Sequence, residues 1–95
     1  MKVRYSLESI DDLQRVVEFV EAKNSFAARR IAIDIQEGVA RLKQFPKIGL
    51  PVLNATEPEQ IRDLHLGNYT VRYLIVEEGI YILRIWHDKE NEKNL

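Results

Sequence analysis

The spacing of apolar residues changes along the chain, and each change predicts a different kind of element. Apolar and basic residues alternate at the start, which predicts a strand over residues 2–6. Apolar residues then recur every three or four positions as far as residue 44, with one polar break at Asn24-Ser25. This pattern predicts helices over residues 8–23 and 26–44. Because the break between them is so short, the two helices should form a hairpin.

Each expected helix has a capping residue at its start and one apolar stripe for the core. Ser6 or Ser9 can cap the first helix and Ser25 the second, since a serine hydroxyl accepts hydrogen bonds from the unpaired amides of a first turn. The stripe of the first helix consists of Ile10, Leu13, Val17 and Val20. The stripe of the second consists of Ala28, Ile31, Ala32, Ile35, Val39 and Leu42.

Four further apolar residues fall outside these stripes. Val16 and Phe19 flank the stripe of the first helix, whereas Phe26 and Ile33 lie one heptad apart on nearly the opposite side of the second. Single exposed apolar residues are normal on protein surfaces, so the pattern has an ordinary explanation. A row of them also suits a surface that a partner covers. We therefore treat these four residues as candidate partner contacts.

The second half of the chain predicts three strands, over residues 60–66, 69–76 and 80–88. Two short turns containing Gly67 and Gly79 join them, which indicates an antiparallel meander. Residues 45–59 hold all three prolines and predict a loop. The expected fold class is therefore α+β: an N-terminal strand, a helical hairpin and a three-stranded meander in one domain over residues 1–95. The polar residues 89–95 should form a frayed tail.

The composition narrows the possible functions. Fourteen Lys and Arg face fifteen Asp and Glu, for a net charge of −1, which argues against free nucleic acid as the main ligand. There is no cysteine, and the two histidines lack partners at metal-ligand spacing, so we expect neither a metal site nor a cofactor. No apolar run is long enough for a membrane span or a leader peptide, so we expect a cytoplasmic protein.

Three arginines of the meander are the first candidates for chemistry. If the register permits, Arg62, Arg72 and Arg84 collect on the sheet face opposite the helices. Guanidinium groups on such a face suit phosphate or carboxylate recognition. The alternative is that each arginine pairs with an acid of the chain itself, and Glu77 and Glu78 are close to Arg72 in sequence.

The end of the last strand supplies two more candidates. Trp86 could stack on a partner or close the core, and the sequence leaves both open. His87 could transfer protons near neutral pH. However, side chains alternate along a strand, so without a bulge His87 faces away from Arg84. We therefore assign no catalytic residue.

Together these segments resemble the RelE/ParE superfamily of toxins from bacterial toxin–antitoxin systems. The similarity extends from residue 3 to about residue 88. The motifs are Asp12-Leu13, Ala27-Ala28, Leu42-Lys43-Gln44-Phe45-Pro46-Lys47-Ile48-Gly49, Ile61-Arg62-Asp63-Leu64, Tyr69-Thr70-Val71-Arg72-Tyr73, and the run from Ile80 to His87. The resemblance implies a helical hairpin against an antiparallel sheet.

The resemblance also implies one of two activities. RelE-like members cut messenger RNA in the ribosome and have a strongly basic face with basic, Tyr- or His-bearing C-terminal residues. ParE-like members inhibit DNA gyrase. Here the end from Asp88 to Lys93 holds three acids and two lysines, and no tyrosine follows Trp86. This departure favours the ParE-like branch and inhibition by binding.

The residue pattern and the family resemblance together suggest which residues contact each partner. Target contacts would come from Arg62, Arg72, Arg84, Trp86 and His87. A cognate antitoxin would bind Val16, Phe19, Phe26 and Ile33. Two alternatives stay open: a ribosome-dependent ribonuclease, and a non-toxic member that only binds its antitoxin.

Overall fold

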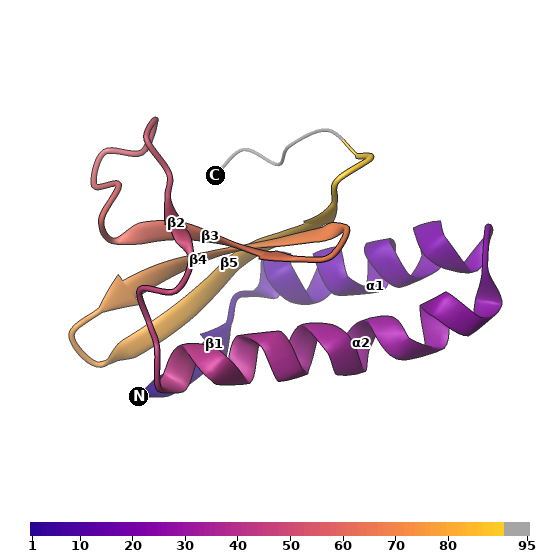
Figure 1. Cartoon of the computed structure of the whole chain (residues 1–95), viewed down its shortest axis with the longest axis horizontal. Coiled ribbons are helices and arrows are strands. Elements are labelled where there is room, and N and C mark those ends of the chain that lie inside the picture. The colour runs from indigo at the N-terminus through magenta and orange to yellow at the C-terminus, as the bar shows by residue number, and fades with distance from the viewer. Residues whose placement is uncertain (91–95) are drawn as a thin grey trace.

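A computed structural model describes residues 1–90 of the chain. One sheet carries two helices on a single face (Figure 1). The elements in chain order are β1 (Lys2–Tyr5), α1 (Leu7–Glu21), α2 (Ser25–Ala40), the 3-10 turn η1 (Arg41–Lys43), β2 (Leu50–Pro51), β3 (Ile61–Leu66), β4 (Tyr69–Val76) and β5 (Gly79–His87). The predicted α+β class and the helical hairpin are confirmed. The expected tail lies mostly in residues 91–95, outside the described part of the chain.

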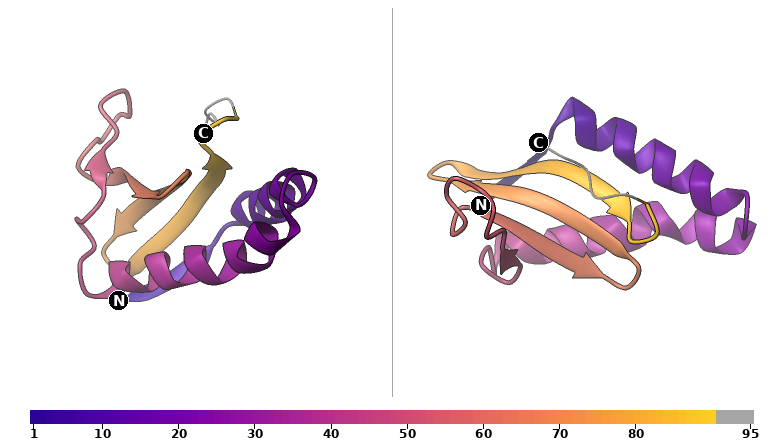
Figure 2. Two further views of the ribbon diagram at one scale, coloured as in Figure 1. Left: turned by 45° about the vertical axis from the view of Figure 1, so that its right-hand side comes forward. Right: turned by 90° about the horizontal axis from the view of Figure 1, so that it is seen from above.

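The sheet has the strand order β1-β5-β4-β3-β2. The meander β3-β4-β5 is antiparallel, as predicted, and β1 joins β5 in parallel at one edge. At the other edge Leu50 and Pro51 form the short β2 inside the segment that we expected to be entirely loop. Figure 2 shows both helices on one face of the sheet, whereas the segment between β2 and β3 rises from the other.

Side-chain caps fix where the helices begin. Ser6 caps α1 by accepting a hydrogen bond from the Ser9 amide at 3.0 Å. Asn24, not the expected Ser25, caps α2 by accepting from the Ala27 amide at 3.0 Å. Asn and Ser are equally good caps, so the sequence could not decide between these neighbours.

The second helix buries the predicted face, whereas the first buries only part of it. Ala28, Ile31, Ile35 and Val39 of α2 are buried, and Leu42 follows them in η1. They pack on sheet residues Leu64, Val71, Tyr73, Ile80, Ile82 and Ile85. In α1 the buried residues are Ser9, Asp12, Val16 and Val20, whereas Ile10 is 52% exposed. Leu13 and Val17 are partly buried against the core, so the helix is rotated only partly from the expected stripe, and Ser9 and Asp12 also become buried.

The orientation of α1 corrects the expected placement of Val16. Its side chain has no exposed surface and belongs to the core, so Val16 does not lie on the surface as a partner contact would. Neither α1 nor α2, the helices of residues 1–90, is long and apolar enough to cross a membrane.

Candidate functional site

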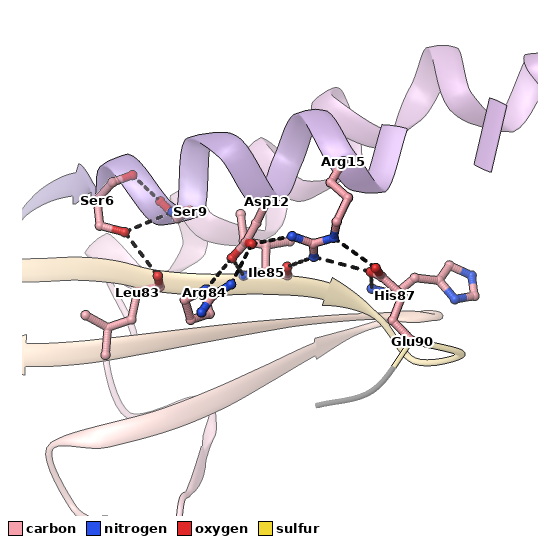
Figure 3. Close-up of polar contacts among 9 residues, drawn as sticks. All are labelled: Ser6, Ser9, Asp12, Arg15, Leu83, Arg84, Ile85, His87 and Glu90. Carbon is pink, nitrogen blue, oxygen red and sulfur yellow. Dashed lines mark hydrogen bonds and ion pairs between the residues drawn. The ribbon is translucent and has the colours of Figure 1, made fainter. Parts of the chain in front are cut away.

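Side chains cover the outer edge of β5, where β1 no longer reaches. The pairing of β1 ends with Tyr5 opposite Ile82, and α1 lies along the rest of β5 (Figure 3). The contacts are Ser6 Oγ to Leu83 O at 3.0 Å, Ile85 N to Asp12 Oδ2 at 2.9 Å, Arg15 Nη2 to Ile85 O at 3.0 Å, and His87 N to Glu90 Oε1 at 3.0 Å. Unpaired strand edges attract other strands, so these bonds close this edge to a partner.

Asp12 is the centre of this arrangement. It is 1% exposed and accepts hydrogen bonds from Arg84 Nε at 2.7 Å and Nη2 at 2.9 Å, and another from Arg15. Burial alone would raise the pKa of Asp12, but the bonds from Arg84, Arg15 and the Ile85 amide outweigh it and hold the pKa below its ordinary value. Asp12 therefore stays ionised and acts as a structural anion.

The sheet face away from the helices holds two of the three predicted arginines. The register places Arg72 between Arg84 on β5 and Asp63 on β3. Asp63 accepts from Arg72 Nε at 2.8 Å and Nη2 at 2.9 Å, and the guanidinium lies 5.1 Å from the centre of the Trp86 ring. The acid beside Arg72 is thus Asp63 across the strands, not Glu77 or Glu78, and Trp86 is buried with 6% exposure.

Arg62 lies on the other face, so the expectation of three arginines on one face is wrong. Its register partner is Tyr73, whose side chain is in the core. Arg62 donates to the carbonyls of Lys47 at 3.2 Å and Gly49 at 2.9 Å, and it pairs with Glu59 at 2.7 Å. A shift of one residue in register moves a side chain to the opposite face, and the sequence did not determine that register.

The two histidines lie in different surroundings. His87 sits between Phe19 and Tyr69, with ring centres 5.4 and 5.2 Å away, and its Nδ1 accepts from the Lys89 amide at 3.0 Å. As strand alternation predicts, it follows Ile85 on the helix side, away from Arg84. His65, which the sequence did not single out, follows Asp63 on the arginine face.

His65 begins a short polar chain. Its Nδ1 is 3.1 Å from Thr70 Oγ1, which donates to Asp88 at 2.7 Å. His65 is exposed, so it is the histidine with access to a ligand on this face. Only the cross-strand pairing of His65 with Thr70 could have revealed this arrangement.

The expected apolar contacts of α2 are on the surface. Phe26 is 78% and Ile33 43% exposed, whereas Phe19 is half-buried against His87. A second exposed apolar group was not foreseen: Phe45 is 59% and Ile48 48% exposed, in the loop after η1.

Comparisons with known proteins agree with this architecture. Residues 3–92 match the family model described as the ParE toxin of the type II toxin–antitoxin system, parDE. The chain belongs to this family. The resemblance to the ParE-like branch is thus confirmed, and the protein is a type II toxin of the ParE family. A comparison with curated protein sequences gives no match.

Two solved structures share the ParE-like fold of this chain. One is described as the chromosomal ParDE TA system from P. aeruginosa, with a TM-score of 0.75 and 22% identity over 92% of this chain and 95% of that one. The other is the toxin–antitoxin complex RelBE2 from Mycobacterium tuberculosis, with a TM-score of 0.63 and 22% identity over 90% and 95%. At this identity the likeness concerns the fold.

Proposed function

We propose that this ParE-family protein inhibits DNA gyrase by binding it, that it breaks no bond itself, and that a cognate antitoxin neutralises it. Family membership supports the toxin role. The observation that favours binding over catalysis is the state of the arginines: Arg72 and Arg84 are held by Asp63 and Asp12. A catalytic cation would have to leave these acids to reach a phosphate, which costs several kcal/mol for a buried pair, on the order of 3–5.

The three arginines then have a different role from the one expected. Arg62 and Arg72 are each 6% exposed, and Arg84 anchors α1 through Asp12. We infer that they position the surfaces around them, and that the main contact with the target comes from other residues.

A cognate antitoxin is the second partner. The exposed pair Phe26 and Ile33 on α2 supports a contact there, since a segment that folds on binding commonly covers such a row. The two similar structures are described as toxin–antitoxin systems, which is consistent with such a partner.

The ribonuclease alternative has one observation in its favour. His65 is exposed on the same sheet face as Arg72 and Arg84, and it is hydrogen-bonded to Thr70. A proton-transfer group is therefore present on that face. Cleavage of RNA would need a second group within about 3 Å of the reacting atoms. The alternative therefore predicts that His65→Ala abolishes toxicity, whereas inhibition by binding predicts little effect of either His65→Ala or His87→Ala.

One experiment separates the candidates. The protein is induced in growing cells, and gyrase–DNA cleavage complexes and the 5′ ends of messenger RNA are mapped in the same samples. We expect cleavage complexes and no new mRNA ends. New mRNA ends that disappear with His65→Ala would replace our proposal with the ribonuclease. Growth arrest without either signal would contradict both, and no arrest would favour a member that only binds its antitoxin.

A further inference from the structure

The loop between η1 and β2 is fixed from beneath by two core side chains. Tyr73 Oη donates to the Pro46 carbonyl at 2.6 Å and accepts from the Gly49 amide at 2.9 Å. Arg62 binds the carbonyls of Lys47 and Gly49. A Cβ at Gly49 would lie 2.7 Å from Tyr73 Oη and 2.9 Å from the Asp63 carbonyl, so only glycine fits this close approach.

The same loop displays apolar side chains to solvent. Phe45 and Ile48 point outward with about half of their surface exposed, and together with Pro46 and Lys47 they line a hollow of about 660 Å³. A rigid loop loses little conformational entropy when it binds, which is what a preorganised interface needs. Exposed apolar side chains on a fixed backbone therefore indicate a contact surface.

The charged residues within this stretch of sequence have one sign. Residues 38–56 contain Arg41, Lys43 and Lys47 and no acid. The exposed Lys2 and Arg4 belong to β1, which contacts η1, and the N-terminus lies beside the end of α2 in Figure 1. Glu78 lies beside Lys2 and Arg4, and Glu59 pairs with Arg62. Cations still predominate along the loop and β1, although the whole chain carries a net charge of −1. An acidic protein surface is the complementary partner.

This surface is separate from the exposed pair on α2. Phe26 lies in the first turn of the 16-residue helix and Ile33 near its middle, whereas Phe45 follows beyond its other end. A helix of this length rises about 24 Å. One protein can therefore engage one partner along α2 and another at the loop beyond its end.

We propose that Arg41, Lys43, Phe45, Lys47 and Ile48, here termed the basic loop end, form the surface that engages an acidic, partly apolar surface of the toxin's protein target. This inference rests on the proposed function, which makes gyrase that target. Phe45 and Ile48 enter the apolar part of the contact, while the cations steer the approach and fix the orientation.

The test uses two matched double variants of the full chain. Phe45→Ser/Ile48→Ser removes the apolar part of the basic loop end, and Phe26→Ser/Ile33→Ser removes the same residue types from α2. Circular dichroism first verifies that both fold. Affinity for purified gyrase is then measured by calorimetry, and growth arrest is measured after induction.

We expect the loop variant to bind gyrase at least about tenfold more weakly, as for a truncated interface anchor, and to lose growth arrest. The α2 variant should bind within about twofold of the wild type, because distant sites act independently. Lys43→Glu/Lys47→Glu should weaken binding most at low salt. The matched control is Lys23→Glu/Lys89→Glu, in which Lys23 lies between α1 and α2 and Lys89 follows β5.

Four outcomes would contradict all or part of the assignment. A loop variant that binds gyrase and arrests growth like the wild type overturns the basic loop end. A wild type that arrests growth without binding gyrase overturns the proposed target, and the growth assay of the loop variant then decides the surface alone. If the wild type does neither, both proposals fail. Calorimetry of the loop variant with the purified antitoxin completes the test, because a variant that loses only the antitoxin assigns the surface to that partner.

Discussion

At the scale of single residues, Asp12 matters most to the described structure. It lies on a helix face that an amphipathic pattern would assign to apolar residues, yet it is buried against the edge of β5. Backbone groups at a sheet edge need partners, and a carboxylate accepts from an amide and two guanidinium groups at once. Closing that edge therefore requires a polar residue at a core position.

Replacing Asp12 should destabilise the fold. In Asp12→Asn the cations of Arg84 and Arg15 lose their anion in a buried site, and we expect a loss of about 3 kcal/mol in the free energy of unfolding. Asp11→Asn is the matched control. Asp11 is exposed, so this substitution should change the free energy of unfolding by less than about 0.5 kcal/mol. Urea denaturation of both variants measures the difference, and equal midpoints would contradict this role.

The same residue makes stability depend on pH. Folding lowers the pKa of Asp12, so its stabilisation is complete above the pKa of an unfolded aspartate, about 3.9, and is lost as the pH falls through the lower folded value. The wild type should therefore lose more stability than Asp12→Asn between about pH 5 and about pH 2. A constant gap between their urea midpoints across this range would show that Asp12 does not titrate as described.

At the scale of elements, the loop after η1 depends on a strand far from it in sequence. Tyr73 is fully buried on β4 and contributes the only phenol hydroxyl bound to this loop in residues 1–90. The sequence predicted a loop over residues 45–59 but could not show that a strand fixes part of it. The hydrogen bonds that hold residues 46–49 come from distant strands, and loop length does not reveal them.

Removing the hydroxyl of Tyr73 tests whether β4 holds this loop. Tyr73→Phe leaves the Pro46 carbonyl and the Gly49 amide without their partner, at a cost of about 1–3 kcal/mol. Hydrogen exchange should rise most at the amides around Gly49, since local opening is what the hydroxyl prevents. Tyr81→Phe is the control, because Tyr81 is 37% exposed on β5. Unchanged exchange in the loop of Tyr73→Phe would mean that other contacts hold it.

At the scale of the whole molecule, the hairpin and the sheet leave separate surfaces for separate partners. The helices cover one sheet face (Figure 2). Exposed apolar residues remain in the first turn of α2 and in the loop beyond its other end. The edge of β5 is closed by side chains, so a partner strand would have to use another edge. Binding to an antitoxin and binding to a target need not compete for the same residues.

The antitoxin surface can be tested by itself. Phe26→Ser/Ile33→Ser should weaken the complex with the cognate antitoxin by about tenfold or more and leave the urea midpoint almost unchanged, because both side chains are exposed. Calorimetry with the purified antitoxin measures the affinity. If this affinity equals that of the wild type, these two residues are outside the interface.

The sequence by itself determined the family and all the main elements except the short β2. Apolar spacing gave the hairpin, the core stripe of α2 and the meander, because those patterns are local and repeat with the period of helix or strand. The motifs spread from residue 3 to residue 88 carried the ParE-like resemblance. The exposure of Phe26 and Ile33 was also readable, since both lie opposite a well-defined stripe.

The tertiary structure decided the roles of the charged residues. Which acid holds Arg72, which face Arg62 occupies, and why Asp12 is buried all depend on strand register and on how α1 lies against β5. The sheet repeats every two residues, so a slip of one position exchanges its faces, and apolar spacing does not record polar bonds to an edge. Contacts between residues more than 70 positions apart, such as Asp12 and Arg84, became visible only when the chain was folded.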